Sequence, residues 1–516
     1  MKRNIFHTLT SSLYLLTIAF TGSVLLNGCK NQGGSNNRYA LTGDTIVDGK
    51  NLVQINCTKC HALVPVNALT KDVWKYHTLP AMGKYLGMTA YLGGYFKRDT
   101  SGLTLLEWQN IVAYYQKMAP GSLPAAKPPV AAVSGMAAFN VVQPKAQPNV
   151  AYTIMAAINP YNHKIYTSDG VSNLLQEWDS NLKLSKSVIL PSPAVHASFV
   201  KNEKGATSGQ FAAIGQLDPV DFPNGKVMSV NLDDDKLKPT VFASELARPV
   251  QTLQGDFNKD GLMDWVVCGQ GGSKGGVYLF KQNPDHSVTQ VNISDKAGAV
   301  KAVSGDFNKD GWPDLMVLFG RGDEGLIMFL NDQHGGFTQK RLLSFPPVYG
   351  STDFELADID HDGNPDLIYS CGYNYNDSRI LKPYHGLYLY KNTGDFNFKQ
   401  QWFYPINGCT KFVTADFNAD GKLDIVTTAF FADLKDNPAE SCIYFEQDKS
   451  FSFKPYTLPV SKYGRWKSMD VGDINNDGKP DVVLGNFSTG YNLQPGLKQT
   501  WDKKLPFIIL QNNFKK

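Results

Sequence analysis

A nine-residue motif occurs five times in the second half of the chain and constrains the fold more than any other feature. The copies are DFNKDGLMD (256–264), DFNKDGWPD (306–314), DIDHDGNPD (358–366), DFNADGKLD (416–424) and DINNDGKPD (473–481). Their starts lie about 50 to 58 residues apart, and self-similarity at such a period is typical of propellers and other repeat arrays. A short apolar run follows each copy, for example WVVCG after the first and IVTTAF after the fourth. The sequence therefore predicts β-rich repeats, each with one carboxylate-rich loop.

The spacing of oxygen-bearing side chains in the motif predicts a calcium site in each copy, about five in all. Asp or Asn stands at positions 1, 3, 5 and 9, and Gly at position 6. Ca²⁺ takes about six to eight oxygen ligands, and Gly permits the sharp turn that lets the carbonyl of position 7 join them. An EF-hand is excluded because position 12 is not Glu and no helical pattern flanks the loops. The predicted ligands are Asp256, Asn258, Asp260, Asp264, Asp306, Asn308, Asp310, Asp314, Asp358, Asp360, Asp362, Asp366, Asp416, Asn418, Asp420, Asp424, Asp473, Asn475, Asp477 and Asp481.

These units resemble the FG-GAP or VCBS repeats of calcium-bearing β-propellers such as the integrin α-subunit head. The resemblance is clear over residues 248–516 and implies an all-β propeller, expected over 148–516. Upstream, AINPYNHKIYTSDG and GQFAAIGQLDP indicate two further blades without the carboxylate pattern. This predicts seven blades, with six or eight as alternatives. Either LPFIILQNN near the C-terminus or the segment from Met136 to Val142 could supply the strand that closes the ring.

A polar residue also recurs five positions before each motif, on what should be the innermost strand of the blade. These residues are Gln251, Lys301, Asp353, Lys411 and Ser468, and the mostly apolar residues that follow them are Thr252, Ala302, Phe354, Phe412 and Met469. Because side chains alternate along a strand, the first set is expected to face a central channel and the second to lie between blades. With His196, Arg248 and Arg465, the first set could line a polar funnel for a small molecule or a glycan. The alternative is a water-filled channel without a ligand.

A different motif, CTKCH, stands at positions 57 to 61. In C-x-x-C-H the two thiols can add across the vinyl groups of a porphyrin while the imidazole reaches the iron. The sequence therefore predicts covalent haem c at Cys57 and Cys60, with His61 as an axial ligand; a zinc or redox C-x-x-C site is the alternative. A helical pattern leads into the motif, and a second, LTLLEWQNIVAYYQKMAP, opens with Thr104 and Glu107 as a capping box.

Residues 46–122 resemble the class I cytochrome c family in this order of helix, C-x-x-C-H, Met-containing loop and aromatic-rich closing helix. The resemblance implies a small all-α domain with a Met in the loop before the last helix as the sixth iron ligand. Met82 is the favoured residue, with Met88, His77 and an open site as alternatives. Met/His ligation raises the potential of the iron and favours electron transfer.

The N-terminus predicts export. MKR and the apolar run from Leu13 to Leu26 form a secretory signal over residues 1–28. The end of this run, LNGC, resembles a lipobox, which implies a lipid-anchored protein of the cell envelope, on the periplasmic or surface side of an outer membrane, acylated at Cys29. Residues 29–45 are expected to be a flexible tether, and the Pro- and Ala-rich segment 123–147 a linker.

Four further cysteines remain: Cys268, Cys371, Cys409 and Cys442. In an oxidising compartment they could pair, and Cys371 with Cys409 is the first pair to test because they stand in neighbouring repeats. The sequence does not decide their connectivity.

The chain is thus expected to be multidomain, a small all-α cytochrome c domain followed by an all-β propeller. A net charge of +3 over 516 residues gives no indication of nucleic-acid binding. The predicted function is electron transfer through haem c, with the calcium-stabilised propeller as a binding or docking platform and an unidentified protein as redox partner. One alternative is a dehydrogenase in the propeller that passes electrons to the haem, although no catalytic residues and no dinucleotide-binding glycine motif are visible. The other is a calcium-dependent adhesin or glycan-binding protein.

Overall fold

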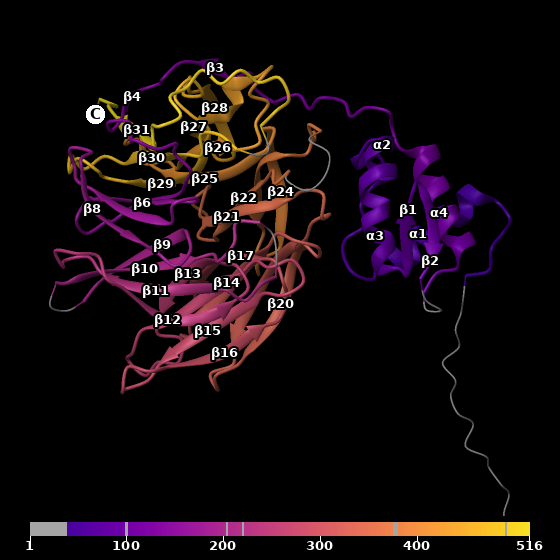
Figure 1. Cartoon of the computed structure of the whole chain (residues 1–516), viewed down its shortest axis with the longest axis horizontal. Coiled ribbons are helices and arrows are strands. Elements are labelled where there is room, and N and C mark those ends of the chain that lie inside the picture. Colours follow the sequence, from indigo (N-terminus) through magenta and orange to yellow (C-terminus); the bar gives the residue numbers. More distant parts are fainter. Residues whose placement is uncertain are drawn as a thin grey trace, which may run out of the picture. The chain divides into compact units, whose positions relative to one another are not determined.

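The computed structural model describes residues 39–98, 102–202, 205–218, 221–374, 380–490 and 493–515. They form a small N-terminal helical region and a seven-bladed β-propeller (Figure 1). The predicted signal peptide, most of the predicted tether and Cys29 lie outside the described residues. Within the described ranges, no helix has the length and apolar character needed to cross a bilayer.

The helical region begins with α1 (Thr45–Cys57) and ends with α4 (Leu105–Met118). The elements between them are η1 (Val66–Ala68), α2 (Lys71–Val73), η2 (Trp74–Thr78), α3 (Leu79–Tyr85) and the hairpin of β1 (Met88–Tyr91) and β2 (Gly94–Lys97). At the start of α4, Thr104 Oγ1 accepts from the Glu107 N–H at 3.2 Å, and Glu107 Oε2 accepts from the Thr104 N–H at 2.6 Å. The predicted capping box is confirmed.

Helices α1 and α4 cross at a close approach that depends on Gly49. A Cβ atom at this position would lie 2.2 Å from the Asn110 carbonyl oxygen and 2.7 Å from Tyr114 Cβ. Any other residue would therefore push the two helices apart. Leu52 of α1 and Ile111 of α4 are buried in the core of this region, so the amphipathic faces of the two helices cover one another.

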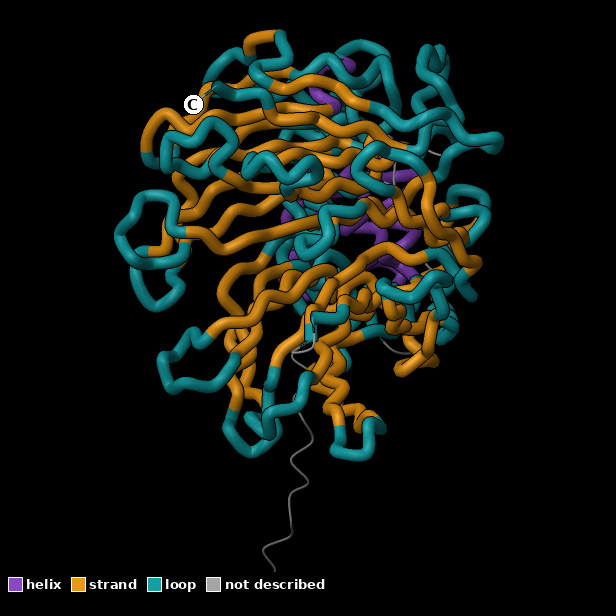
Figure 2. Tube along the Cα trace, turned by 90° about the vertical axis from the view of Figure 1, so that its left-hand side faces the viewer, coloured by secondary structure: helices purple, strands orange, loops and turns teal. Residues whose placement is uncertain are grey.

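The propeller consists of seven sheets, and the first strand of each sheet lines a central cavity. Figure 2 shows the propeller as strands joined by loops. Blade 1 consists of β5 (Thr153–Ile158), β6 (Ile165–Asp169), β7 (Leu174–Trp178) and β8 (Leu184–Ile189). Blade 2 consists of β9 (Ala194–Lys201), β10 (Thr207–Ala213), β11 (Gly225–Asn231) and β12 (Pro239–Leu246). They correspond to the two predicted blades without carboxylate loops, so the expected number of seven is confirmed.

Blades 3 to 7 each carry one copy of the motif between their first and second strands. Blade 3 consists of β13 (Pro249–Gly255), β14 (Asp264–Gly269), β15 (Gly276–Gln282) and β16 (Val288–Ser294). Blade 4 consists of β17 (Ala299–Gly305), β18 (Asp314–Phe319), β19 (Gly325–Asn331) and β20 (Phe337–Ser344). Blade 5 is β21 (Ser351–Ala357), β22 (Asp366–Cys371), β23 (Gly386–Asn392) and β24 (Phe398–Pro405). Blade 6 is β25 (Cys409–Ala415), β26 (Asp424–Ala429), β27 (Cys442–Lys449) and β28 (Ser452–Thr457), with η3 (Pro438–Ser441) before β27. The strands predicted after each motif are β14, β18, β22, β26 and β30.

Blade 7 closes the ring with strands from both ends of the propeller sequence. Its strands are β29 (Trp466–Gly472), β30 (Asp481–Asn486), β31 (Phe507–Asn512) and β4 (Phe139–Val142). The two segments considered as alternatives for closure are thus both used, because Ile509 of β31 pairs with Val142 of β4 (Figure 1). Phe139 is buried in the core of this junction.

The prediction of a linker over 123–147 is therefore wrong from Val133 onward. Besides β4, this segment contributes β3 (Val133–Ser134), which pairs in parallel with β28 of blade 6. The Pro- and Ala-rich composition of the segment conceals the four-residue strand, whose burial depends on partners at the far end of the chain.

The disulfides that the sequence left open do not form among the described residues, in which all six cysteines are free thiols. Cys371 and Cys409 are both fully buried but not bonded, and Cys371 Sγ instead donates to the Tyr384 carbonyl oxygen at 3.3 Å. Cys268 Sγ similarly donates to Gln251 Oε1 at 3.5 Å. These cysteines fill space in the core as small apolar side chains.

Candidate functional site

The five motif loops share one backbone conformation. The Gly at position 6 has a positive φ in every copy, from 78° to 86°, as the sequence predicts. The residue at position 4 has a positive φ as well, although it is Lys259, Lys309, His361, Ala419 or Asn476. A non-glycine residue in this region costs roughly 1 kcal/mol or more, so the surrounding contacts must hold each loop in place.

The Asp at position 1 supplies the first of these contacts. In the first loop, Asp256 Oδ2 accepts from the Gly261 N–H at 3.0 Å and Oδ1 from the Asp260 N–H at 3.2 Å. The same two bonds occur in the other four loops, at 2.8 to 3.1 Å. The carboxylate at position 1 thereby closes every loop into the same turn.

The Asp at position 9 joins the loop to the rest of the blade. All five of these side chains are buried, and in each Oδ2 accepts from the backbone N–H of position 2. In each, Oδ1 accepts from a backbone N–H at the end of the third strand, at 2.8 to 3.0 Å. Burial raises the pKa of all five carboxyls, to about 6 for Asp424 and Asp481.

The residues that bind position 9 were missed by the sequence reading, although each carries a side-chain amide. They are Gln282, Asn331, Asn392, Gln447 and Asn512. Three of them also donate from the side chain to the carbonyl oxygen of position 2 in the loop of the preceding blade: Asn331 to Phe257, Gln447 to Ile359 and Asn512 to Phe417. An Asn or Gln one or two residues after the apolar run of the third strand is the signal that could have identified them.

The third loop has carboxylates at all four side-chain ligand positions, and three of them converge. Oxygens of Asp358, Asp360 and Asp366 lie within 4.8 Å of one another. Oδ1 of Asp360 is buried and has no hydrogen-bond partner among the described atoms. Lys391 of β23 forms an ion pair with Asp360 and another, at 3.0 Å, with Asp362. This oxygen-only cluster fits a hard divalent cation, and the ammonium group compensates part of its charge.

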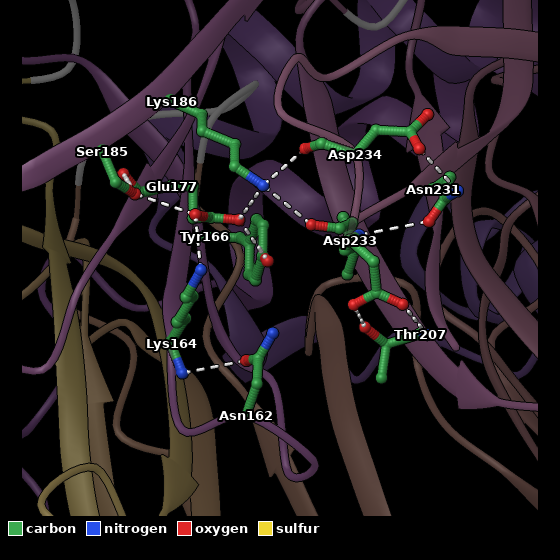
Figure 3. Close-up of polar contacts among 11 residues, drawn as sticks. Asn162, Lys164, Tyr166, Glu177, Ser185, Lys186, Thr207, Asn231, Asp233 and Asp234 are labelled. Atoms are coloured by element: carbon green, nitrogen blue, oxygen red, sulfur yellow. Dashed lines mark hydrogen bonds and ion pairs between the residues drawn. The ribbon is translucent and has the colours of Figure 1, made fainter. Parts of the chain in front are cut away.

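Blades 1 and 2 have a buried polar network where the other blades have carboxylate loops (Figure 3). The fully buried Glu177 accepts hydrogen bonds from Lys164 Nζ at 2.8 Å and Tyr166 Oη at 2.7 Å. Ser185 Oγ donates to it as well, at 2.8 Å. Lys186 connects this network to blade 2 by donating to the carbonyl oxygens of Leu232 and Asp234 at 2.9 and 2.6 Å. Burial raises the pKa of Glu177, but the hydrogen bonds outweigh it and leave the pKa lowered.

In the helical region, the C-x-x-C-H motif spans the end of α1 and the turn that follows it. Cys57 and His61 are half-buried, whereas Cys60 is exposed. His61 Nδ1 lies 2.8 Å from the Ala62 carbonyl oxygen, to which it donates, and Nε2 takes no part in this contact. Burial, and then the neighbouring Cys60, raise the pKa of the Cys57 thiol to about 11.

The three candidates for a sixth iron ligand differ in burial. Met82 of α3 is half-buried, Met88 at the start of β1 is 1% exposed, and His77 is exposed. Met88 packs in the core beside Gly83, where an added Cβ would lie 3.3 Å from Met88 Cβ. Trp108 of α4 is 1% exposed, and its Nε1 has no hydrogen-bond partner among the described atoms.

The innermost strands of the propeller enclose a cavity of about 520 Å³. The predicted funnel residues that line it are Gln251, Lys301, Asp353, Lys411, Ser468, His196 and Arg248. Arg465 does not line this cavity; it is 2% exposed, and its Nε donates to the Phe430 carbonyl oxygen at 3.1 Å. The residues predicted to lie between blades are all buried.

Several of the lining side chains are occupied by contacts across blade junctions. Asp353 lies between two cations, with Lys301 Nζ at 2.8 Å and Lys411 Nζ at 3.3 Å. The Gln251 side chain bonds the backbone of Ala302 in the next blade at 2.6 and 2.9 Å. Burial, then the positive charges of Lys411 and Lys301, lower the pKa of His196 to about 3, so its imidazole is neutral.

Lys467 is a cavity residue that the sequence reading missed. It stands one position before Ser468 on β29 and lines the cavity together with Phe430, Phe431 and Phe487. The apolar residues at the equivalent position of other blades, such as Val250 and Val300, gave no reason to single it out.

Comparison with known proteins identifies the repeats. The family of FG-GAP-like repeats matches residues 256–317, 306–369 and 379–427. No curated protein matches this chain in sequence.

Solved structures similar to this chain include a streptogramin B lyase, with 11% identity, a TM-score of 0.46 and coverage of 72% of this chain and 97% of that chain. The virginiamycin B lyase from Staphylococcus aureus has 9% identity, a TM-score of 0.44 and coverage of 72% and 99%. BBS1N in complex with ARL6DN has 9% identity, a TM-score of 0.42 and coverage of 73% and 99%. Together, the matched repeats and the seven sheets show that this chain contains a seven-bladed β-propeller with FG-GAP-like repeats.

Proposed function

We propose that this protein is a lipid-anchored c-type cytochrome that transfers electrons and whose propeller is a calcium-stabilised binding platform. The observation that carries the proposal is the C-x-x-C-H motif, in which both thiols are free and the His61 ring is held by the Ala62 carbonyl oxygen. A hydrogen bond to Nδ1 orients an imidazole that binds a metal through Nε2.

The residues of the helical region fit haem c. Cys57 and Cys60 would hold the porphyrin through thioether bonds, and His61 would bind the iron. Met82 would be the second axial ligand, because the Met88 side chain is buried in the core. The Trp108 N–H would find an acceptor in a bound group, since a buried donor without a partner costs about 1–3 kcal/mol. When bound, the haem iron takes up and releases one electron.

Calcium would brace blades 3 to 7. Each motif loop presents carboxylate or amide oxygens on a preformed turn, and crowded carboxylates repel until a cation neutralises them. The unpartnered oxygen of Asp360 supports this assignment for the third loop. Because position 9 is bonded to the end of the third strand, and three of the amides there bond the preceding blade, ion binding would stabilise blade junctions as well as single loops.

The anchor would hold this unit at a membrane surface of the cell envelope through acylated Cys29. Each CH₂ group of a buried acyl chain contributes about 0.8 kcal/mol to the free energy of membrane binding. The propeller would then present its cavity and loops to a binding partner, while a separate redox protein exchanges electrons with the haem.

The test is spectroscopic. The full-length protein, made in cells that attach haem to C-x-x-C-H motifs, should show a reduced low-spin haem spectrum and a mass increase of one haem that survives denaturation. Cys57→Ala with Cys60→Ala should abolish the mass increase. A protein without covalent haem under these conditions would refute the electron-transfer function.

A further inference from the structure

One wall of the propeller cavity carries a lysine that has no counter-ion in the described part of the chain. Lys467 Nζ lies 4.8 Å from the centre of the Phe430 ring, and the described residues provide it with no hydrogen bond or ion pair. On the same ring, the Arg465 guanidinium carbon lies 3.7 Å from the centre. A partly buried charge that is compensated only by an aromatic face is costly, which makes this position a candidate for binding an anion.

The carboxylates that line the cavity are already engaged by other groups. Asp353 is paired with Lys301 and Lys411. Glu355 accepts from Thr414 Oγ1 at 2.6 Å, and Asp470 accepts from the backbone N–H of Ile158 at 2.8 Å. None of these carboxylates forms an ion pair with Lys467, so its positive charge is available to a ligand.

Aromatic rings surround this end of the cavity. Phe430 lies 5.1 Å from Phe431 and 5.7 Å from Phe487, measured between ring centroids. Tyr373 packs against Phe431 at 5.7 Å. All four side chains line the cavity, so a ligand near Lys467 would meet a wall of ring faces and edges.

We propose that this end of the cavity binds a small organic carboxylate that carries a ring, with Lys467 pairing with the carboxylate and the aromatic wall packing against the ring. The inference rests on the proposed role of the propeller as a binding platform and does not depend on the haem. A cavity of about 520 Å³ is of the size that takes small molecules. Aromatic acids and sugar acids share this chemistry, since both have a flat or apolar ring face beside a carboxylate.

The electrostatics of the cavity predict how binding depends on pH. Burial, followed by the positive charges of Arg465, Arg248 and Lys411, lowers the pKa of Lys467 to about 8. The ammonium form that attracts a carboxylate is therefore present below this pH and lost above it. Of the other ionisable groups that line the cavity, His196 is neutral, and Asp353 has a lowered pKa because Lys301 and Lys411 outweigh its burial. Burial raises the pKa of the Glu355 and Asp470 carboxyls.

The experiment measures binding of 4-fluorobenzoate to the full-length protein by ¹⁹F NMR line broadening, with 4-fluorobenzamide as the uncharged probe. The ¹⁹F signal of 4-fluorobenzoate should broaden and that of 4-fluorobenzamide should not. Unlabelled benzoate or glucuronate should displace 4-fluorobenzoate and sharpen its signal again. The better competitor of the two identifies the class of acid. Lys467→Gln should weaken binding about ten-fold or more. The matched control is Lys462→Gln, because Lys462 is exposed and lies 5.1 Å from the Tyr463 ring.

Equal binding of carboxylate and amide, an unchanged affinity in Lys467→Gln, or no binding of the carboxylate would overturn the proposal. A melting curve verifies that the variant is folded. If Lys467→Gln does not fold, the affinity of the wild-type protein for 4-fluorobenzoate is measured as a function of pH. Loss of binding between pH 7 and 9 supports the proposal, and an affinity that does not change with pH refutes it. The haem spectrum of the same sample separates the two hypotheses, since a protein without haem that binds the carboxylate contradicts only the electron-transfer function.

Discussion

Asp314 and Asn331 connect a motif loop to its own blade and to the preceding one. Asp314 Oδ1 accepts from the Asn331 backbone N–H at 2.8 Å, and Asn331 Nδ2 donates to the Phe257 carbonyl oxygen of blade 3 at 2.9 Å. Both side chains are buried. The carboxylate at position 9 thus organises a blade junction as well as a turn.

Replacing Asn331 should therefore destabilise the propeller even without calcium. Asn331→Ala removes a buried donor and leaves the Phe257 carbonyl oxygen without this partner, so the free energy of unfolding should fall by about 1–3 kcal/mol. The measurement is a melting temperature in excess chelator. Asn308→Ala, at exposed position 3 of the same motif, is the control and should have little effect in chelator. Equal losses in the two variants would contradict the role of Asn331 at the junction.

Removal of calcium should lower the melting temperature of the propeller, because an ion that binds only the folded state stabilises it. Lys391→Met should enlarge the increase in melting temperature that calcium produces, since the ammonium that pairs with Asp360 and Asp362 would no longer compete with the ion. Calcium titrations followed by thermal unfolding test both statements. Lys454→Met removes an exposed ion pair with Asp448, 3.6 Å long, and should leave the calcium effect unchanged. No change after verified calcium removal would argue against the stabilising role.

The assigned haem ligands have distinguishable variants. His61→Ala should abolish the low-spin spectrum, whereas His77→Ala should retain it. Met82→Leu should lower the reduction potential without unfolding the helical region, because loss of Met/His ligation removes the contribution of the thioether. Met88→Leu should retain the potential and reduce stability by less than about 1.5 kcal/mol, as a volume-conserving change in a core. A potential that shifts in Met88→Leu and not in Met82→Leu would reverse the assignment.

Glu177 should make a pH-dependent contribution to stability that is independent of calcium. Its folded-state pKa is lowered, so the contribution is present above the ordinary pKa of Glu and lost as pH falls through the lowered value. Glu177→Gln should destabilise the protein by about 3–5 kcal/mol near pH 7, because Lys164 and Lys186 lose their buried partner. The difference in melting temperature between Glu177→Gln and the wild type should become smaller as the pH falls from 7 to 3. Glu245→Gln, at an exposed position, should match wild type throughout.

Local features of the fold followed from the sequence. Gly261 and its equivalents have the positive φ that the spacing of carboxylates requires, and the strands after each motif are where the apolar runs predict them. The Thr104–Glu107 capping box formed as expected, since it depends on a few neighbouring residues. The seven blades were predictable because one period of about 50 to 58 residues recurs along the chain.

Contacts between distant segments were decided by the tertiary structure. The pairing of Val142 with Ile509 made a strand of a segment whose composition indicated a linker. The burial of Cys371 and Cys409 as separate thiols, the clamp from Asn331 to Phe257 and the position of Lys467 against Phe430 all depend on which blades adjoin. Periodicity and turn chemistry act over a few residues and can be read from the chain, whereas a blade junction or a cavity wall exists only after the ring has closed.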